Sequence, residues 1–402
     1  MRRLIHLSVF YFTSMLDGLC LILFPASSPF FKKAPFGISD EQYGAVFLPM
    51  IVLAVIVTLL FKKLYRRWGA EKLFFASLLS HAVFIAGLAA AYAVLGINGS
   101  APWILAAAHP FLGLGFGLLV SVMNLRCVEM FPEKRDAVLS GLHAMLGLGA
   151  ALAPLAAEFF YQGGDWLKAP AICLLMLGLS WFFAAASGAA REEKICPADF
   201  SPAASELPKA PLPLRAWMYL GALILYGTVE AALGNWSGLY LTSEKGFGLG
   251  TAAGALSVFW LFMTLGRLGA TFYSLRHDPR ILYRVSPLFI ALSVAGIVWN
   301  QDESRVLMLY AAVGASCSYF FPLTISLSTR AFERWREPLS SLTVACLMVG
   351  VGAGSSLCGW IKSFEPVSLG GIFMGLIFLA LSAGALAWIL TQGVPARQAA
   401  SS

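Results

Sequence analysis

Long apolar segments separated by short polar ones run along almost the whole chain. Each is about as long as the roughly 20 apolar residues that an α-helix needs to cross a bilayer. Uninterrupted runs of this length indicate membrane helices rather than strands. We therefore predict twelve transmembrane helices, over residues 4–30, 43–61, 73–95, 103–128, 138–160 and 166–187, and then over residues 215–241, 250–273, 281–298, 306–327, 339–361 and 367–390.

One polar segment, residues 188–214, is longer than the others and is rich in Pro, Ala, Ser and charged residues. This composition is typical of a linker. Six apolar segments precede it and six follow. The turn between the second and third segment is basic in both halves, as KKLYRRWGAEK and YSLRHDPR show. We predict an internal repeat: an N-terminal six-helix bundle over residues 1–187, a cytoplasmic linker over residues 188–214, and a C-terminal six-helix bundle over residues 215–402.

Composition agrees with a membrane protein. Of the 402 residues 59% are hydrophobic and only 12% are charged, about half the charged fraction of a soluble protein. The net charge of +7 does not indicate nucleic-acid binding, because most of the 28 Lys and Arg residues lie in short loops on one side of the predicted helices. Positive loops stay in the cytoplasm. We therefore predict a multi-pass protein of the inner membrane with both termini cytoplasmic.

Other signals in the chain are weak. The start, MRRLIHLSVF, has the basic tip of a signal peptide, but Asp17 interrupts its apolar run and no A-x-A-like site follows, so we interpret it as a retained helix. The seven cysteines show no CxxC spacing, which predicts no disulfide framework. His81, His109 and His143 fall on three different predicted helices. The sequence therefore indicates neither a metal nor a cofactor.

Two acids lie near the middle of predicted helices, Asp17 in residues 4–30 and Glu230 in residues 215–241. An acid at that depth costs about 2.5–3.5 kcal/mol on insertion scales and usually faces a bundle interior or a water-filled path. Asn235 and Trp236 follow Glu230 closely, which places an amide and an indole near the carboxylate. We predict that Asp17 and Glu230 bind the solute or carry a coupling proton. The alternative is that each only hydrogen-bonds neighbouring helices.

The predicted architecture resembles the major facilitator superfamily. That superfamily carries a glycine, aspartate–arginine, glycine and basic motif between its second and third helices. Arg67, Gly69 and Lys72 match it, whereas Lys62 and Arg66 stand where a glycine and the aspartate are expected. The resemblance implies an all-α membrane fold of two pseudo-symmetric bundles, with a site that opens to one side at a time. It assigns Arg67 and Gly69 to the inner gate.

A closer similarity is to the fucose:proton symporter family. It rests on Asp17 with Pro25, on FGISDEQYGA, on the pattern Tyr226, Glu230, Gly234, Trp236 and Tyr240, on Gly266–Arg267, and on SYFFPLTISL. In the family's fucose symporter, an acid in the first helix and one in the fourth serve the proton and sugar. Asp17 matches the first, and the second falls near Val120, where this chain has no acid. His143 falls where the family has a sugar-binding glutamine, and a histidine can donate to a hydroxyl or titrate with pH.

By that resemblance the first, fourth, seventh and tenth helices line a solute cavity. Carboxylates, amides and indoles together suit a polyhydroxylated solute. Arg267, toward the inner end of residues 250–273, is the only arginine that we place near mid-membrane, which disfavours a strongly anionic solute. The predicted substrate-binding residues are Asn124, His143, Tyr226, Asn235, Trp236, Tyr319 and Thr324, and the predicted gating residues are Arg67, Gly69 and Arg267.

These residues favour a secondary active transporter of a small, sugar-like solute, coupled to protons or Na⁺ and working as a monomer in the lipid bilayer. One alternative is a proton-coupled efflux antiporter of small amphiphilic compounds or metabolites, since GLGAALAP faintly resembles an antiporter signature. A sensor that binds without transport is another. An enzyme is not predicted, because the chain has no HExxH motif and no soluble catalytic domain.

Overall fold

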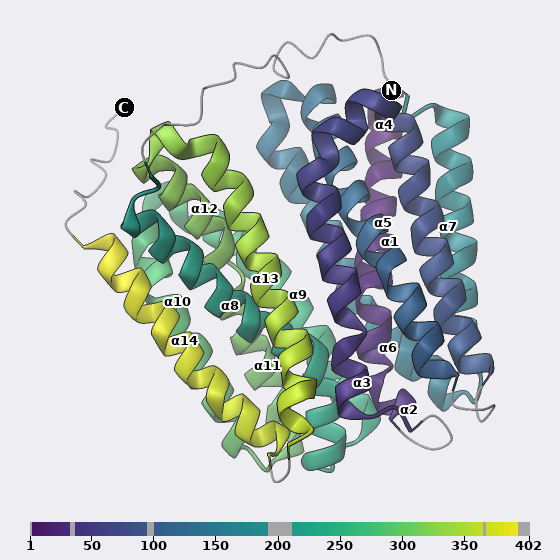
Figure 1. The fold of residues 1–402 in the computed structure, drawn as a ribbon, viewed down its shortest axis with the longest axis vertical. Helices are drawn as coiled ribbons and strands as arrows, with labels where there is room; N and C mark the ends of the chain where they lie inside the picture. The colour runs from purple at the N-terminus through teal and green to yellow at the C-terminus, as the bar shows by residue number, and fades with distance from the viewer. Residues whose placement is uncertain (1, 33–36, 95–99, 192–210, 365–366, 393–402) are drawn as a thin grey trace.

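The computed structural model describes residues 2–32, 37–94, 100–191, 211–364 and 367–392, and these residues form helices joined by short connections. Figure 1 shows two helical bundles side by side, one formed by the helices before residue 192 and the other by those after residue 210. Within the described residues, eleven helical spans are long and apolar enough to cross a membrane. The predicted all-α membrane class is confirmed.

One labelled helix of the first bundle, α4, covers two of the predicted helices. Its helices are α1 (Arg2–Ala26), α2 (Ser28–Phe31), α3 (Asp40–Ala45), α4 (Phe47–Ala93), α5 (Ala101–Met130), α6 (Arg135–Gln162) and α7 (Lys168–Ser187). The predicted helices 43–61 and 73–95 are two helices that meet across a kink at Gly69, where φ is 76° and ψ is 167°, and the label α4 covers both. The eleven apolar spans found among the described residues count these two helices as one span of 54 residues, Asp40–Ala93.

The second bundle contains a helix that breaks in its middle. Its elements are α8 (Leu214–Leu239) with a π turn (Tyr240–Glu244), α9 (Leu249–Arg276), α10 (Pro279–Trp299), α11 (Glu303–Cys317), α12 (Phe320–Ala331), α13 (Arg336–Lys362) and α14 (Leu369–Thr391). The predicted helix 306–327 is thus divided into α11 and α12. Residues 192–210 of the predicted linker lie outside the described residues, so the domain boundaries stay a prediction.

The two bundles meet most closely at one end, near α2 and α3, and diverge toward the end that carries the N-terminus (Figure 1). Glycines permit the contacts between the bundles. A Cβ on Gly147 of α6 would lie 1.9 Å from Thr264 Oγ1 of α9, and one on Gly359 of α13 would lie 2.4 Å from the carbonyl oxygen of Asp40 in α3. Small residues allow helix backbones to approach this closely. We call the end near α3 the closed end.

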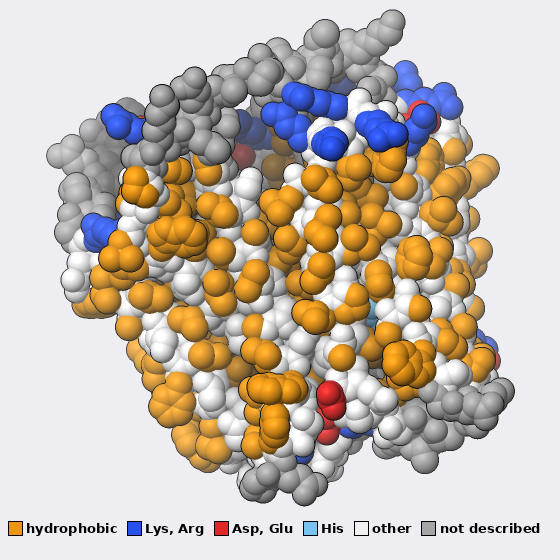
Figure 2. All heavy atoms as spheres, in the orientation of Figure 1, with side chains coloured by type: hydrophobic (Ala, Val, Ile, Leu, Met, Phe, Trp, Pro, Cys, Tyr) orange, Lys and Arg blue, Asp and Glu red, His pale blue; other side chains and the backbone are white. Residues whose placement is uncertain are grey.

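Charge is distributed unevenly along the bundles. Figure 2 shows hydrophobic side chains over the flank of the molecule, and Lys and Arg side chains gathered at the end that carries the N-terminus, which we call the basic end. Large apolar residues face outward in both bundles, such as Phe182, of which 63% is exposed, and Phe378, of which 71% is exposed. A surface of this kind suits lipid rather than water.

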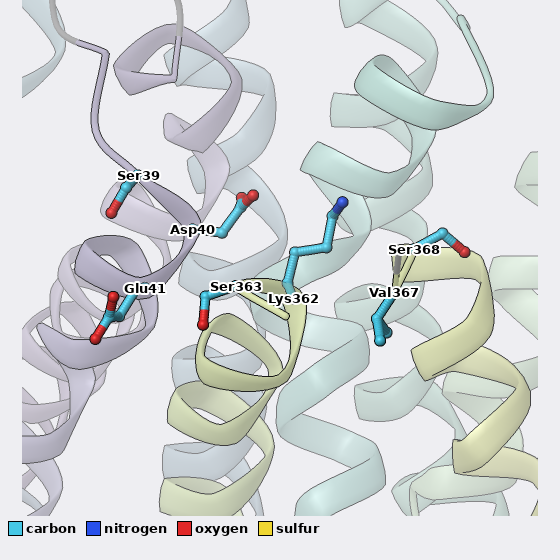
Figure 3. Close-up of a pocket in the computed structure, with 7 residues that line it drawn as sticks. All are labelled: Ser39, Asp40, Glu41, Lys362, Ser363, Val367 and Ser368. Carbon is cyan, nitrogen blue, oxygen red and sulfur yellow. The ribbon is translucent and has the colours of Figure 1, made fainter. Parts of the chain in front are cut away.

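A polar pocket of about 440 Å³ lies at the closed end, between α3 and the connection from α13 to α14. Figure 3 shows Lys362 extending from the end of α13 into this pocket, with Asp40 and Ser368 on either side. The Lys362 ammonium lies 3.7 Å from a carboxylate oxygen of Glu244. Polar and charged side chains therefore gather where the two bundles close.

Candidate functional site between the two bundles

An acid and an arginine of the second bundle lie within electrostatic range of each other. Glu230 lies in the middle of α8 and is half-buried. Its carboxylate interacts electrostatically with Arg267 of α9 and with the phenol of Tyr226, one turn earlier on α8. A nearby opposite charge offsets the cost of holding a carboxylate in apolar surroundings. The structure thus brings together Glu230, Arg267 and Tyr226, and we call these three residues the Glu230 cluster.

The Glu230 cluster holds the break between α11 and α12. The Tyr226 hydroxyl donates a 2.7 Å hydrogen bond to the carbonyl oxygen of Cys317, the last residue of α11. Arg267 Nε donates a 3.3 Å hydrogen bond to the carbonyl oxygen of Ser318. Tyr319 lies in the break and is half-buried. Irregular backbone at membrane depth is tolerated where it is buried in protein or lines a cavity, and transporters build binding sites from such broken helices.

Two further predicted residues lie in the first bundle, and one of them is within electrostatic range of the Glu230 cluster. His143 of α6 is half-buried and experiences the positive charge of Arg267. Asn124 of α5 is half-buried too, and none of the described residues forms a hydrogen bond with its buried Oδ1 atom. A buried amide oxygen without a partner is costly, so it is a natural acceptor for a bound hydroxyl.

A tryptophan that the sequence did not single out lies beside the cluster. The Trp260 ring of α9 packs over Gly234, where a Cβ would lie 2.9 Å from a ring carbon. Gly234 is one turn from Glu230 on the same face of α8. The Trp260 ring is half-buried, and its Nε1 atom is buried without a hydrogen-bond partner among the described residues. An indole face and an unused N–H donor are therefore available next to the carboxylate.

Three predicted binding residues have contacts that join helices. The Asn235 amide donates a 2.7 Å hydrogen bond to Ser355 Oγ of α13. The Trp236 indole is fully buried and donates a 2.9 Å hydrogen bond to the carbonyl oxygen of Ser355. Thr324 of α12 is fully buried, and its hydroxyl lies 3.3 Å from the Tyr283 hydroxyl of α10. In this conformation their polar groups are engaged within the protein, and a role in solute binding stays a prediction.

Asp17 lies apart from the Glu230 cluster, inside the first bundle. Its side chain is almost fully buried, and Asp17 Oδ1 lies 2.8 Å from Nε2 of His81 in α4. Two polar residues one turn earlier on α1 form contacts within the same bundle, since Thr13 contacts Ser180 Oγ at 2.6 Å and Ser14 donates to the carbonyl oxygen of Leu142. The two predicted acids therefore occupy two separate sites.

Comparison with known proteins places this arrangement in a family. The model of the Major Facilitator Superfamily matches residues 7–334. The chain belongs to the major facilitator superfamily. It is therefore a transporter rather than an enzyme. An uncharacterised MFS-type transporter of Yersinia pestis is 24% identical over 373 residues, 89% of each chain. The glucose/mannose transporter GlcP of Bacillus subtilis is 23% identical over 289 residues, 67% of this chain and 69% of GlcP.

Solved structures share the superfamily fold. A bacterial homologue of the human lysosomal transporter Spinster, inward-facing and occupied, aligns with a TM-score of 0.72 at 12% identity, over 96% of both chains. The nucleoside transporter NupG aligns with a TM-score of 0.71 at 12% identity, over 96% of this chain and 98% of NupG. The fucose:proton symporter FucP of E. coli aligns with a TM-score of 0.61 at 14% identity, over 98% of this chain and 100% of FucP. The predicted fold and its resemblance to the superfamily are confirmed.

The superfamily motif lies at the basic end. Gly69 has a positive φ in a region that is nearly restricted to glycine. Arg67 is exposed beside it. Neither residue contacts the Glu230 cluster in the interactions described above, so their gating role stays a prediction. Among the described residues, no group of three or more His, Cys, Asp or Glu is placed to hold a metal ion.

Proposed function

We propose that this superfamily transporter imports a small, neutral, polyhydroxylated solute such as a sugar, together with protons. The observation that carries the proposal is the Glu230 cluster, a half-buried carboxylate beside Arg267 at a helix break. A carboxylate accepts hydrogen bonds from hydroxyl groups, and Arg267 keeps the site near electrical neutrality. A neutral solute needs no further charge, whereas an anion would compete with Glu230 for Arg267.

The surroundings of the cluster suit a sugar ring. Trp260 offers an aromatic face and a free indole N–H, and Asn124 offers a free amide oxygen. His143 and Tyr319 add a ring nitrogen and a phenol, both half-buried. Among its relatives, GlcP is described as a glucose/mannose transporter and FucP as a fucose:proton symporter. We place the solute between Glu230, Trp260 and Asn124.

We also propose the orientation and the conformational state. Lys and Arg gather at the basic end (Figure 2), and positive loops remain in the cytoplasm. The basic end, and with it both termini, then faces the cytoplasm of a cell whose inner membrane the protein crosses as a monomer. The bundles close at the opposite end, which makes this the state with the outer side closed.

Counterflow in proteoliposomes tests the proposed solute class. Vesicles loaded with one unlabelled sugar or polyol are given the same labelled compound outside, and its transient uptake is followed. We expect uptake of at least one neutral sugar, lost in Glu230→Gln because the cluster then has no carboxylate to accept hydroxyl hydrogen bonds. Glu133→Gln is the matched control, since Glu133 is exposed in the turn before α6 and should transport normally.

The same panel separates the alternatives. Counterflow of a sugar that is unaffected by Glu230→Gln would contradict the assignment of the site to the Glu230 cluster. If no sugar or polyol shows counterflow and amphiphilic compounds are exported in a proton-driven way, the protein is the efflux antiporter instead. Binding of a solute without counterflow would favour a sensor.

A further inference from the structure

The contact between Asp17 and His81 restricts where protons can lie. His81 Nδ1 is 2.9 Å from the carbonyl oxygen of Ser77, and His81 Nε2 is 2.8 Å from Asp17 Oδ1. A carbonyl only accepts hydrogen bonds, so Nδ1 carries a proton. The contact at 2.8 Å then needs one more proton, either on Nε2 or on the carboxyl group. Without it, a nitrogen lone pair would face a carboxylate oxygen at hydrogen-bond distance.

We propose that Asp17 and His81 share a single exchangeable proton and form the proton-carrying site of the transport cycle. The proton lies either on Asp17, as a carboxylic acid that donates to a neutral imidazole, or on His81, as an imidazolium that donates to a carboxylate. Both arrangements are electrically neutral as a pair. This proposal rests on the proposed function only for the coupling of the proton to solute movement.

The surroundings of the pair supply no substitute for that proton. At most 1% of Asp17 is exposed, and His81 is fully buried. Gly115 of α5 packs against the His81 ring, where a Cβ would lie 2.5 Å from Nδ1, and the backbone of Leu146 and Ala150 of α6 closes against Gly18. The thiol of Cys20 on α1 lies near Asp17, and the thiol of Cys173 on α7 lies near Cys20. None of the described residues hydrogen-bonds Asp17 Oδ2.

The pair differs from the Glu230 cluster in what it requires. Glu230 is accompanied by an arginine, which stays charged at all accessible pH values, so its carboxylate is compensated without a proton. Asp17 is accompanied by a histidine, the side chain that most readily changes its charge near neutral pH. The two acids therefore divide the work: Glu230 binds the solute and Asp17 takes the proton with His81.

Release of the proton changes the packing of α1 against α4. When the proton leaves to water, Asp17 remains as a carboxylate and His81 as a neutral imidazole protonated on Nδ1. Two acceptors then face each other at a distance that suits a hydrogen bond, and the attraction between the helices becomes a repulsion. The present packing is therefore that of the proton-loaded pair, and proton release favours a rearrangement of α1 and α4.

A transport assay that separates exchange from accumulation tests this role. Counterflow exchanges solute for solute and needs no net proton movement, whereas accumulation uses the pH gradient. With one proton per solute, a gradient of one pH unit drives about tenfold accumulation, since one unit is worth about 1.4 kcal/mol. We expect His81→Gln and Asp17→Asn to retain counterflow and to lose the accumulation. The double variant should show the same counterflow and the same loss of accumulation as either single variant, because both changes remove the same proton site.

His109→Gln is the matched control, because His109 is an equally buried histidine whose ring is packed among Phe24, Phe47 and Phe84 rather than against Asp17. It should keep both counterflow and accumulation. Full pH-driven accumulation in His81→Gln would overturn the proposal. If the wild-type protein shows no counterflow with any sugar or polyol, the proposed solute class is wrong, which is a separate outcome.

A second measurement decides the question without any solute. Histidine-selective nitrogen NMR of the purified protein resolves protonated from bare ring nitrogens, and the His81 signals are those absent in His81→Gln. In wild type we expect Nδ1 of His81 to carry a proton and Nε2 to be hydrogen-bonded through the proton that it shares with Asp17. The Nε2 signal should shift strongly in Asp17→Asn. An Nε2 signal that is unchanged by Asp17→Asn would overturn the shared proton, whatever the transport assays show.

Discussion

The Tyr43 hydroxyl of α3 donates a 2.6 Å hydrogen bond to the backbone carbonyl oxygen of Asn235 in α8, and so ties the first bundle to the second. The rings of Tyr43 and Trp236 meet edge to face with their centres 4.8 Å apart. Tyr43 itself is fully buried. The segment that follows Glu230 on α8 therefore forms part of the closed end, directly beside the proposed solute site.

Removing this hydroxyl should loosen the closed end. Tyr43→Phe keeps the ring but loses the hydrogen bond to Asn235, which is worth roughly 0.5–1.5 kcal/mol. We expect the population of molecules opened at this end to rise by about two- to tenfold, seen as faster hydrogen–deuterium exchange in α3. Tyr11→Phe is the control, because the Tyr11 hydroxyl donates to Val138 within the first bundle. Unchanged exchange in α3 would show that the contact does not hold the closure.

The charge pair of the Glu230 cluster should show energetic coupling. Glu230→Gln leaves Arg267 without its anion, Arg267→Gln leaves the carboxylate without its cation, and the double variant removes both charges. We expect the double variant to be more stable than the sum of the single changes predicts, by about 0.5–3 kcal/mol in unfolding by SDS. The exposed pair of Glu71 and Arg191 is the control and should show little coupling. Strictly additive effects at Glu230 and Arg267 would argue against the pair.

Hydropathy predicted the helical segments well, because a membrane helix depends on an apolar run whose length the bilayer fixes. It placed a boundary between two helices around Gly69, where the structure has a kink at that one residue. It missed the break at Tyr319. The segment around Tyr319 looks like a continuous helix, but hydrogen bonds from Tyr226 and Arg267 hold its backbone open. Contacts between distant helices, which the local pattern does not contain, decide the break at Tyr319.

The candidate site was predicted in part for a similar reason. The rarity of acids in membrane helices was enough to select Asp17 and Glu230. Their partners were harder to identify, because His81 is 64 residues from Asp17 and shares no local motif with it. Trp260 had no distinguishing sequence signal, and only its contact with Gly234 and its unpaired N–H identify it. A second ionisable residue in another predicted membrane helix is the signal that could have identified His81.

Gly115 should be essential for the contact between His81 and Asp17. A Cβ at Gly115 would lie 2.5 Å from His81 Nδ1, so Gly115→Ala must displace the ring. We expect this variant to reproduce the His81→Gln phenotype, with counterflow retained and pH-driven accumulation lost. Gly178→Ala on α7 is the control, since a Cβ there meets no heavy atom of the described residues within 4 Å. Normal accumulation in Gly115→Ala would mean that His81 can shift without losing its proton.

The backbone of Gly69 should resist any side chain. Its φ of 76° and ψ of 167° fall in a region that costs other residues about 1–3 kcal/mol. Gly69→Ala should therefore lower the apparent melting temperature of the purified protein. Gly221→Ala, in the regular helix α8 with open space around the new Cβ, should be neutral or slightly stabilising. A Gly69→Ala variant as stable as wild type would show that the backbone relaxes at this turn without cost.

Trp260 should contribute to solute affinity through its indole N–H. Trp260→Phe keeps an aromatic face over Gly234 but removes the donor, so the KM for the transported sugar should rise by roughly two- to tenfold, the value of one hydrogen bond, while kcat changes little. Trp236→Phe is a control for effects on the closed end. The Trp236 indole N–H already donates to the carbonyl oxygen of Ser355, so losing this donor should affect the closed end and not the KM. Trp181→Phe, on the exposed face of α7, should leave KM unchanged. If KM responds equally to all three substitutions, the effect reflects general loss of packing; a response confined to Trp260 places the solute against its ring.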